Sequence, residues 1–154
     1  LSMGARHAQA DNDDARSVDE LLAGLEPRMR SGKFVFTAIG PAKLELLRRA
    51  DAVITEDEGI TAIISKDIAR DQNLDYEYVA AWITLSAQTG LHVVGVTAMV
   101  SSAFASAGIS CNVIAGLHHD HLLVPWKQRE DAIELIQEVS EAAADRLEQG
   151  ALAS

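Results

Sequence analysis

The sequence predicts an α+β protein built of two tandem ferredoxin-like units, each a βαββαβ arrangement. Two observations predict this fold. The order strand, helix, strand, tight turn, strand, helix can be traced twice along the chain, and that order builds an antiparallel sheet with helices on one face. The length of 154 residues also suits two small units that share a core.

The first half opens with a short helix and a strand. Residues 17–20, Ser-Val-Asp-Glu, form a capping box, with serine at the cap and glutamate three residues later. Residues 33–39, KFVFTAI, are aromatic and β-branched, which is typical of a strand. Gly40-Pro41 ends that strand, and residues 42–50 are a weaker helical prediction.

A hairpin and a helical turn complete the first half. The strands AVIT (52–55) and ITAIIS (60–65) flank an acidic turn that ends at Gly59. Glycine supplies the permissive backbone that a hairpin needs. A further turn of helix is expected at 66–72. The closing strand of the unit is not obvious, and the first strand of the second half is a candidate for it.

The second half begins with a buried strand at 79–85 and a polar loop at 86–90. Residues 91–107 are expected to form a helix, which Gly108 closes. Residues 91–109 are apolar enough to be considered as a transmembrane helix. We favour a buried helix instead, because the segment carries serine, threonine and histidine and lacks flanking basic anchors.

The remaining elements are a hairpin and a long helix. Strands are expected at 109–115 and 119–124, with Gly116 in the turn between them and Pro125 at the end. Residues 128–147 are predicted to form an amphipathic helix, whose apolar residues recur at helical spacing.

Four segments make up the expected organisation. Residues 1–16 are polar and patternless, which predicts a disordered N-terminal segment or a tag remnant. The two units are assigned to 17–75 and 76–148, and residues 149–154 are a tail.

Composition excludes some classes of function. The net charge is -10 and no basic run is present, which argues against nucleic acid or an anionic membrane as partner. The single cysteine and the absence of a secretory signal favour a cytoplasmic setting. No Gly-rich phosphate loop is present, and a catalytic triad cannot be assembled from spacing alone, although serines and histidines are present. We expect neither a cofactor nor an enzyme.

The segment 82–125, with its "AGIS-N-V-AG--HDH-LVP" pattern, resembles the C-terminal half of small stand-alone tandem ACT-domain proteins. "GKFVFTAI" and "AVITEDEGITAII" resemble the N-terminal half. The resemblance implies ACT-type units that sense ligands, often amino acids, and often work in pairs. One departure is the loop at 89–92, Thr-Gly-Leu-His, where the family usually has paired serines and an acidic residue.

The stretch from His118 to His121 leaves alternatives open. On a strand, His119 and His121 share one face, and Asp120 lies on the other. A structural zinc site normally needs four ligands, so a metal-binding protein is one alternative. Hydrogen bonding at a hairpin end is the plainer interpretation. A ligand contact by His119 and Asp120 is the third.

The candidate ligand-binding residues lie in two further segments. The loop at 86–90 leads into a predicted helix N-terminus, where exposed amides and the helix dipole favour a carboxylate. Asn112 is expected in the interior of a neighbouring strand, where a buried amide must be hydrogen-bonded. The complete set is Thr89, Gly90, Leu91, Cys111, Asn112, Val113, His119 and Asp120. We read Cys111 itself as a small hydrophobe rather than a nucleophile.

The sequence thus supports a hypothesis and two alternatives. The hypothesis is a non-enzymatic regulatory module that binds an amino acid or small carboxylate and acts in trans on an unknown protein. The alternatives are a metal-binding protein and a structural oligomerisation domain. Small residues along 91–107 also suggest a homodimer interface, although core packing would explain them equally well.

Overall fold

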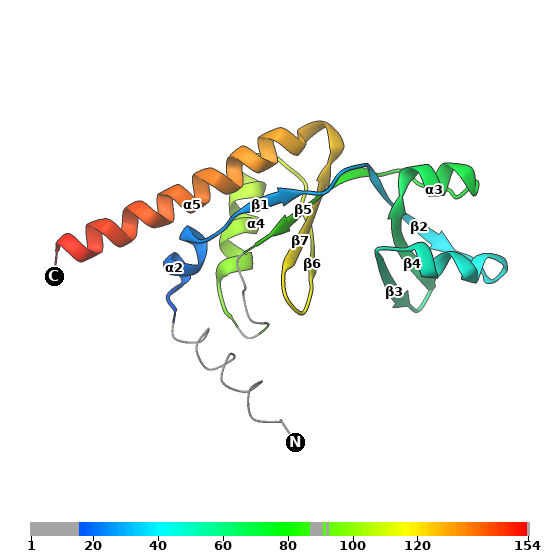
Figure 1. Cartoon of the computed structure of the whole chain (residues 1–154), viewed down its shortest axis with the longest axis horizontal. Coiled ribbons are helices and arrows are strands. Elements are labelled where there is room, and N and C mark those ends of the chain that lie inside the picture. The colour runs from blue at the N-terminus through cyan, green and yellow to red at the C-terminus, as the bar shows by residue number, and fades with distance from the viewer. Residues whose placement is uncertain (1–15, 87–90, 92, 154) are drawn as a thin grey trace, which may run out of the picture.

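The structure, a computed structural model, describes residues 16–86, 91 and 93–153 (Figure 1). Its strands form one seven-stranded antiparallel sheet in the order β3-β4-β2-β5-β7-β6, and β1 pairs with β5 beside this path. In chain order the strands are β1 (Pro27–Met29), β2 (Phe34–Ile39), β3 (Ala52–Glu56), β4 (Gly59–Ser65), β5 (Val79–Leu85), β6 (Asn112–Ala115) and β7 (Asp120–Pro125).

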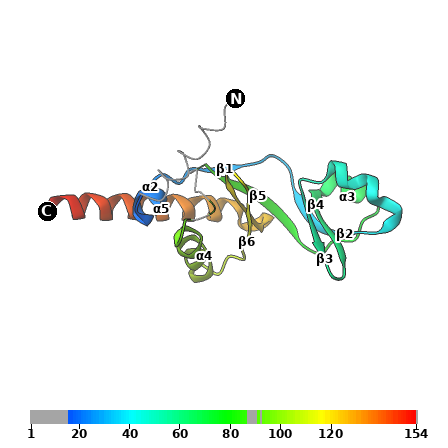
Figure 2. The ribbon, with the colours of Figure 1, turned by 90° about the horizontal axis from the view of Figure 1, so that it is seen from below.

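The helices are distributed between the two ends of the molecule (Figures 1 and 2). They are α2 (Val18–Ala23), the 3-10 helix η1 (Pro41–Arg49), α3 (Lys66–Asp71), α4 (Val96–Ser106), the 3-10 turn η2 (Trp126–Gln128) and α5 (Arg129–Leu152). The elements η1 and α3 lie with β2, β3 and β4 at one end, whereas α2, α4 and α5 lie at the other, where α5 runs out toward the C-terminus.

Strand β5 joins the two halves of the sheet. One of its edges pairs with β1 near Leu85 and with β2 near Ala80, and its other edge pairs with β7. The first strand of the second half therefore closes the first sheet, as the sequence suggested. Each half thus has the strand order of a ferredoxin-like unit, and the prediction of an α+β fold with two such units in tandem is confirmed.

Alternation along the strands divides the core between two faces. In β5, Ala81, Ile83 and Leu85 point toward the helices and are fully or almost fully buried there. Ala80 and Trp82 point to the opposite face, which the helices do not cover, and pack there with Phe34. Trp82 is only 3% exposed.

The N-terminal helix packs with the second half of the chain. The capping box at Ser17 and Glu20 is present, as predicted. Leu21 and Leu22 of α2 are buried in the cluster that α4, α5, β5 and β7 build. An ion pair of 2.6 Å between Asp19 and Arg146 of α5 adds a polar contact. The division into units at 17–75 and 76–148 stays a prediction.

Two element predictions need correction, and one strand was not predicted. The helix expected from residue 91 begins at Val96, because Gly95 has a φ of +105° and interrupts helical geometry. The strand expected from residue 109 begins at Asn112. Strand β1 was not among the expected elements, and its first residue is Pro27, a position in a strand where proline is acceptable.

The other elements lie close to the predicted positions. The final helix reaches Leu152, five residues beyond the expected 147. Within the described residues, no helix is long and apolar enough to cross a membrane. The predicted disorder of residues 1–16 falls, except for Arg16, outside the described part of the chain.

Candidate functional site

The predicted carboxylate-binding loop lies mostly outside the described residues. Thr89 and Gly90 are not described, so their predicted role stays a prediction. Leu91 is described and is 61% exposed. Leu91 does not belong to α4, whose first residue is Val96.

The three predicted residues around β6 point in different directions. Val113 pairs with Leu122 and packs toward the helices, as does Cys111. Asn112 pairs with Leu123 on the helix-free face and is exposed. The expectation of a buried Asn112 amide is therefore wrong, because this residue begins the strand instead of lying within it.

The Cys111 thiol is poorly suited to nucleophilic chemistry. Burial raises its pKa to about 11, so the reactive thiolate is scarce at neutral pH. The side chain packs against the apolar cluster under α4 and α5. These features agree with its interpretation as a small hydrophobe.

Tyr78 connects β6 to the beginning of β5. Burial raises the pKa of its phenol, and hydrogen bonds with Ser110 and Asn112 partly offset that effect. The phenol also donates a long hydrogen bond of 3.4 Å to the carbonyl oxygen of Leu123. The exposed Asn112 side chain therefore lies beside the phenol of Tyr78, the residue that precedes β5.

The histidine-rich hairpin places Asp120 and His121 at the start of β7 and His119 just before it. His121 lies on the helix-free face, where its Nδ1 is 3.0 Å from the Thr84 hydroxyl and its ring is 5.2 Å from the Trp82 ring. His119 precedes β7, and its Nδ1 is buried with no hydrogen-bond partner among the described residues. Asp120 is the first residue of β7 and pairs with Ala115.

Gly116 is required at the turn of this hairpin. Its N–H donates to the carbonyl oxygen of His119 at 2.9 Å. A Cβ at this position would lie 2.7 Å from that same oxygen and 3.2 Å from Nε2 of His121. The glycine therefore allows the backbone approach that holds both imidazoles next to the turn.

The environment of His121 lowers its pKa below the ordinary value of 6.5. Burial is the largest cause, since it disfavours the charged imidazolium. The neighbouring His119 and Arg30 lower the pKa further, and Asp120 opposes them. The neutral ring is therefore favoured in the folded protein.

This shift predicts a pH dependence of stability. As the pH falls below about 6.5, the unfolded chain takes up the proton first, so the free energy of unfolding decreases until the pH passes the lower folded pKa. We expect His121→Gln to reduce this loss between about pH 7 and pH 5, measured by urea denaturation at both values.

His118→Gln is the matched control, because His118 is exposed on the same hairpin. This variant should keep the pH dependence of the wild-type protein. If His121→Gln and His118→Gln had the same pH dependence as the wild type, burial of His121 would not contribute to acid sensitivity.

The hairpin does not assemble a metal-binding group. Within the described residues, no three histidine, cysteine, aspartate or glutamate side chains are placed to hold a metal ion together.

A pocket of about 320 Å³ lies where β2 turns into η1. Gly40 and Lys43 line it from this turn, and Asp75 lines it from the segment before β5. The buried Thr37 hydroxyl donates to the carbonyl oxygen of Asp75 at 2.8 Å, and the Lys43 ammonium donates to the carbonyl oxygen of Gln72. These bonds tie the two walls of the pocket together.

This turn in the first half corresponds to the loop at 86–90 in the second half, which the sequence predicts to bind a carboxylate. Each follows the first strand of its unit and precedes the next helix. The sequence pattern of Gly40-Pro41 indicates only the end of a strand, and it does not predict a role for Thr37, Lys43 or Asp75. The repeat of elements was the signal that could have indicated this position. The described members of the predicted set do not line this pocket.

Comparison with known proteins identifies the class. Models of the ACT domain match the chain twice, over residues 15–81 and 77–138. A protein of unknown function from Vibrio cholerae, described as a possible transport protein, has a crystal structure 30% identical in sequence, with a TM-score of 0.73. This match covers 80% of the present chain and 95% of the Vibrio chain. The chain belongs to the ACT-domain family and carries two such domains in tandem.

More distant structures share the fold. A protein from Agrobacterium tumefaciens matches at 18% identity and a TM-score of 0.58, over 75% of this chain and 89% of that one. The ligand-free regulatory subunit of aspartate kinase from Thermus thermophilus matches at 16% identity and a TM-score of 0.56, over 73% and 95%. Among curated proteins, no similar sequence was found. Family and fold together support a regulatory, ligand-binding module.

Proposed function

We propose that this protein is a non-enzymatic regulatory module that binds an amino acid and acts in trans on another protein. The tandem ACT domains support the regulatory class. The observation that carries the choice of ligand is the pocket at the β2–η1 turn, where Lys43 and Asp75 line one cavity.

A pocket with one ammonium and one carboxylate suits a zwitterion. The Lys43 side chain would attract the carboxylate of a bound amino acid, and Asp75 would attract its α-amino group. The volume of about 320 Å³ is near the lower end of the range for small-molecule sites, which favours a ligand of amino-acid size.

The loop at 89–91 and Asn112 remain the proposed site in the second half. Asn112 is exposed on the helix-free face, so its amide is accessible from that side. A homodimer would place two such modules together. Ligand binding that favours one arrangement of the modules would change the surface that is presented to a partner protein. Homodimer formation and action in trans are parts of the proposal.

A thermal-shift screen against the twenty amino acids tests the proposal. A ligand of the folded state must raise the melting temperature when its concentration exceeds its dissociation constant. We expect at least one amino acid to do so at millimolar concentration. For that amino acid, Asp75→Asn should weaken binding by about tenfold, because the charge-assisted bond is lost.

Asp57→Asn is the matched control, since Asp57 is exposed at the tip of the β3–β4 hairpin. It removes the same charge without touching the pocket and should leave affinity unchanged. Asn112→Ala reports on the second-half site in the same assay. If no amino acid raised the melting temperature, the proposed ligand class would be wrong.

A further inference from the structure

A second pocket, of about 540 Å³, lies where the two halves of the chain meet. Lys33 and Lys66 line it from the first half, at the beginning of β2 and of α3. Residues 77–79 line it from the segment that leads into β5, and residues 125–128 from the end of β7 and the turn η2. Lys33 precedes β2 and Gly40 follows it, so the two pockets lie at opposite ends of this strand.

The walls of this pocket concentrate positive charge. Three of the four lysines in the chain line it, namely Lys33, Lys66 and Lys127. Glu77 is the acidic residue among the lining residues, which leaves an excess of two positive charges. The protein as a whole carries a net charge of -10, so the positive charge of this pocket is opposite in sign to the net charge of the protein.

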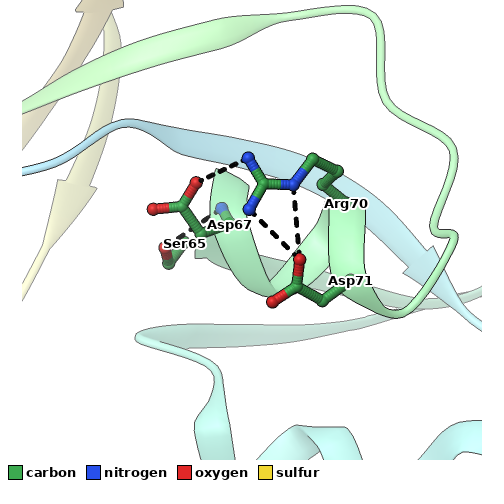
Figure 3. Close-up of polar contacts among 4 residues, drawn as sticks. All are labelled: Ser65, Asp67, Arg70 and Asp71. Atoms are coloured by element: carbon green, nitrogen blue, oxygen red, sulfur yellow. Dashed lines mark hydrogen bonds and ion pairs between the residues drawn. The ribbon is translucent and has the colours of Figure 1, made fainter.

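The three ammonium groups are not neutralised within the described part of the chain, where none of them forms a salt bridge. The acidic residues that follow Lys66 are engaged elsewhere, as Figure 3 shows. Arg70 lies 3.4 Å from Asp67 and 3.2 Å from Asp71. Lys66 is therefore left available for a negative charge from outside the chain.

An aromatic side chain forms part of the same wall. The Lys33 ammonium lies 4.9 Å from the centre of the Trp126 ring, and the Arg129 guanidinium lies 4.4 Å from it. Arg129 also donates to the Trp126 carbonyl oxygen at 3.0 Å, which fixes the turn at η2. Val79 and Pro125 add apolar surface. The pocket thus combines cations with a flat apolar region.

We propose that this pocket binds a small organic dianion, either a phosphomonoester or a dicarboxylate, with an apolar body beside Trp126. Two negative charges match the excess of two positive charges in the wall. The volume of about 540 Å³ accommodates a ligand larger than an amino acid. This site is separate from the amino-acid pocket and does not depend on the proposed function.

Binding here would connect the two halves of the molecule. Backbone contact already joins the first two lysines, because the N–H of Lys66 donates to the carbonyl oxygen of Lys33 at 2.8 Å. Lys127 comes from the second half. A dianion held by all three side chains would therefore stabilise one arrangement of the halves.

Isothermal titration calorimetry on the full chain tests the inference with three probes. Phenyl phosphate represents the phosphomonoester, succinate the dicarboxylate, and benzyl alcohol is the uncharged comparison. We expect at least one anion to bind at millimolar concentration or better, and benzyl alcohol not to bind. Lys127→Gln and Lys66→Gln should each weaken binding of the anion by about tenfold.

Arg49→Gln is the control for loss of one positive charge, because Arg49 is exposed on η1 and does not line the pocket. It should bind the anion like the wild-type protein. Preference for phenyl phosphate or for succinate assigns the head group. Absence of binding by both anions would overturn the inference. It would also be overturned if Arg49→Gln weakened anion binding as much as the two lysine variants do. Asp75→Asn should not change anion affinity, so failure here is distinguishable from failure of the amino-acid proposal.

Discussion

Replacing Leu22 with alanine is expected to lower the free energy of unfolding by about 2–5 kcal/mol. Leu22 is fully buried in α2, in one cluster with Phe104 of α4 and Ile136 of α5. The substitution removes apolar contacts and leaves a cavity that these helices can fill only in part. Urea denaturation followed by far-ultraviolet circular dichroism measures the change.

Leu44→Ala is the matched control, because Leu44 is 47% exposed on η1. Its effect should stay within about 0.5 kcal/mol, as for most surface substitutions. An equal cost of the two substitutions would show that the N-terminal helix does not belong to the core of the second half.

Replacing Gly95 with alanine is expected to cost about 1–3 kcal/mol, the usual range for a residue held in a sparsely populated backbone conformation. Gly95 caps α4 with a φ of +105°, which side-chain-bearing residues rarely adopt. An added Cβ would also lie 3.2 Å from Cγ2 of Val18 in α2. The same denaturation assay measures the loss.

Gly40→Ala separates these effects from the general effect of removing a glycine. Gly40 stands in the same position before η1, but its φ is -76° and its Cβ would meet no atom within 4 Å. Its replacement should be neutral or slightly stabilising, because it restricts the unfolded chain. A similar loss for both variants would contradict the role given to the backbone of Gly95.

Much of the fold could be predicted because local chemistry and tertiary packing agree. The capping box at Ser17 and the hairpin glycine at Gly59 specify their elements through adjacent residues alone. Strand β1 could not be predicted in this way. Its three residues are mostly exposed and pair with β5, more than fifty positions later, so no local pattern marks them.

The candidate sites were harder to predict for a related reason. The sequence drew attention to chemically conspicuous residues such as His119 and Asn112. Lys43 and Lys127, which line the two pockets, are individually ordinary polar side chains. Each pocket forms only when segments that are distant in the sequence come together in the fold, and the sequence alone does not predict which segments do so.

The packing of α2 on α5 has a consequence for how the protein is made. The Ser140 hydroxyl donates to the carbonyl oxygen of Ala23, which lies 117 positions earlier. At about 5–20 residues per second, a ribosome needs on the order of 6–23 seconds to add that length of chain. Leu21 and Leu22 are synthesised before α5, so their contacts with that helix can form only after the intervening chain has been translated. During synthesis, the apolar face of α2 therefore cannot be covered by α5 until that helix has been translated.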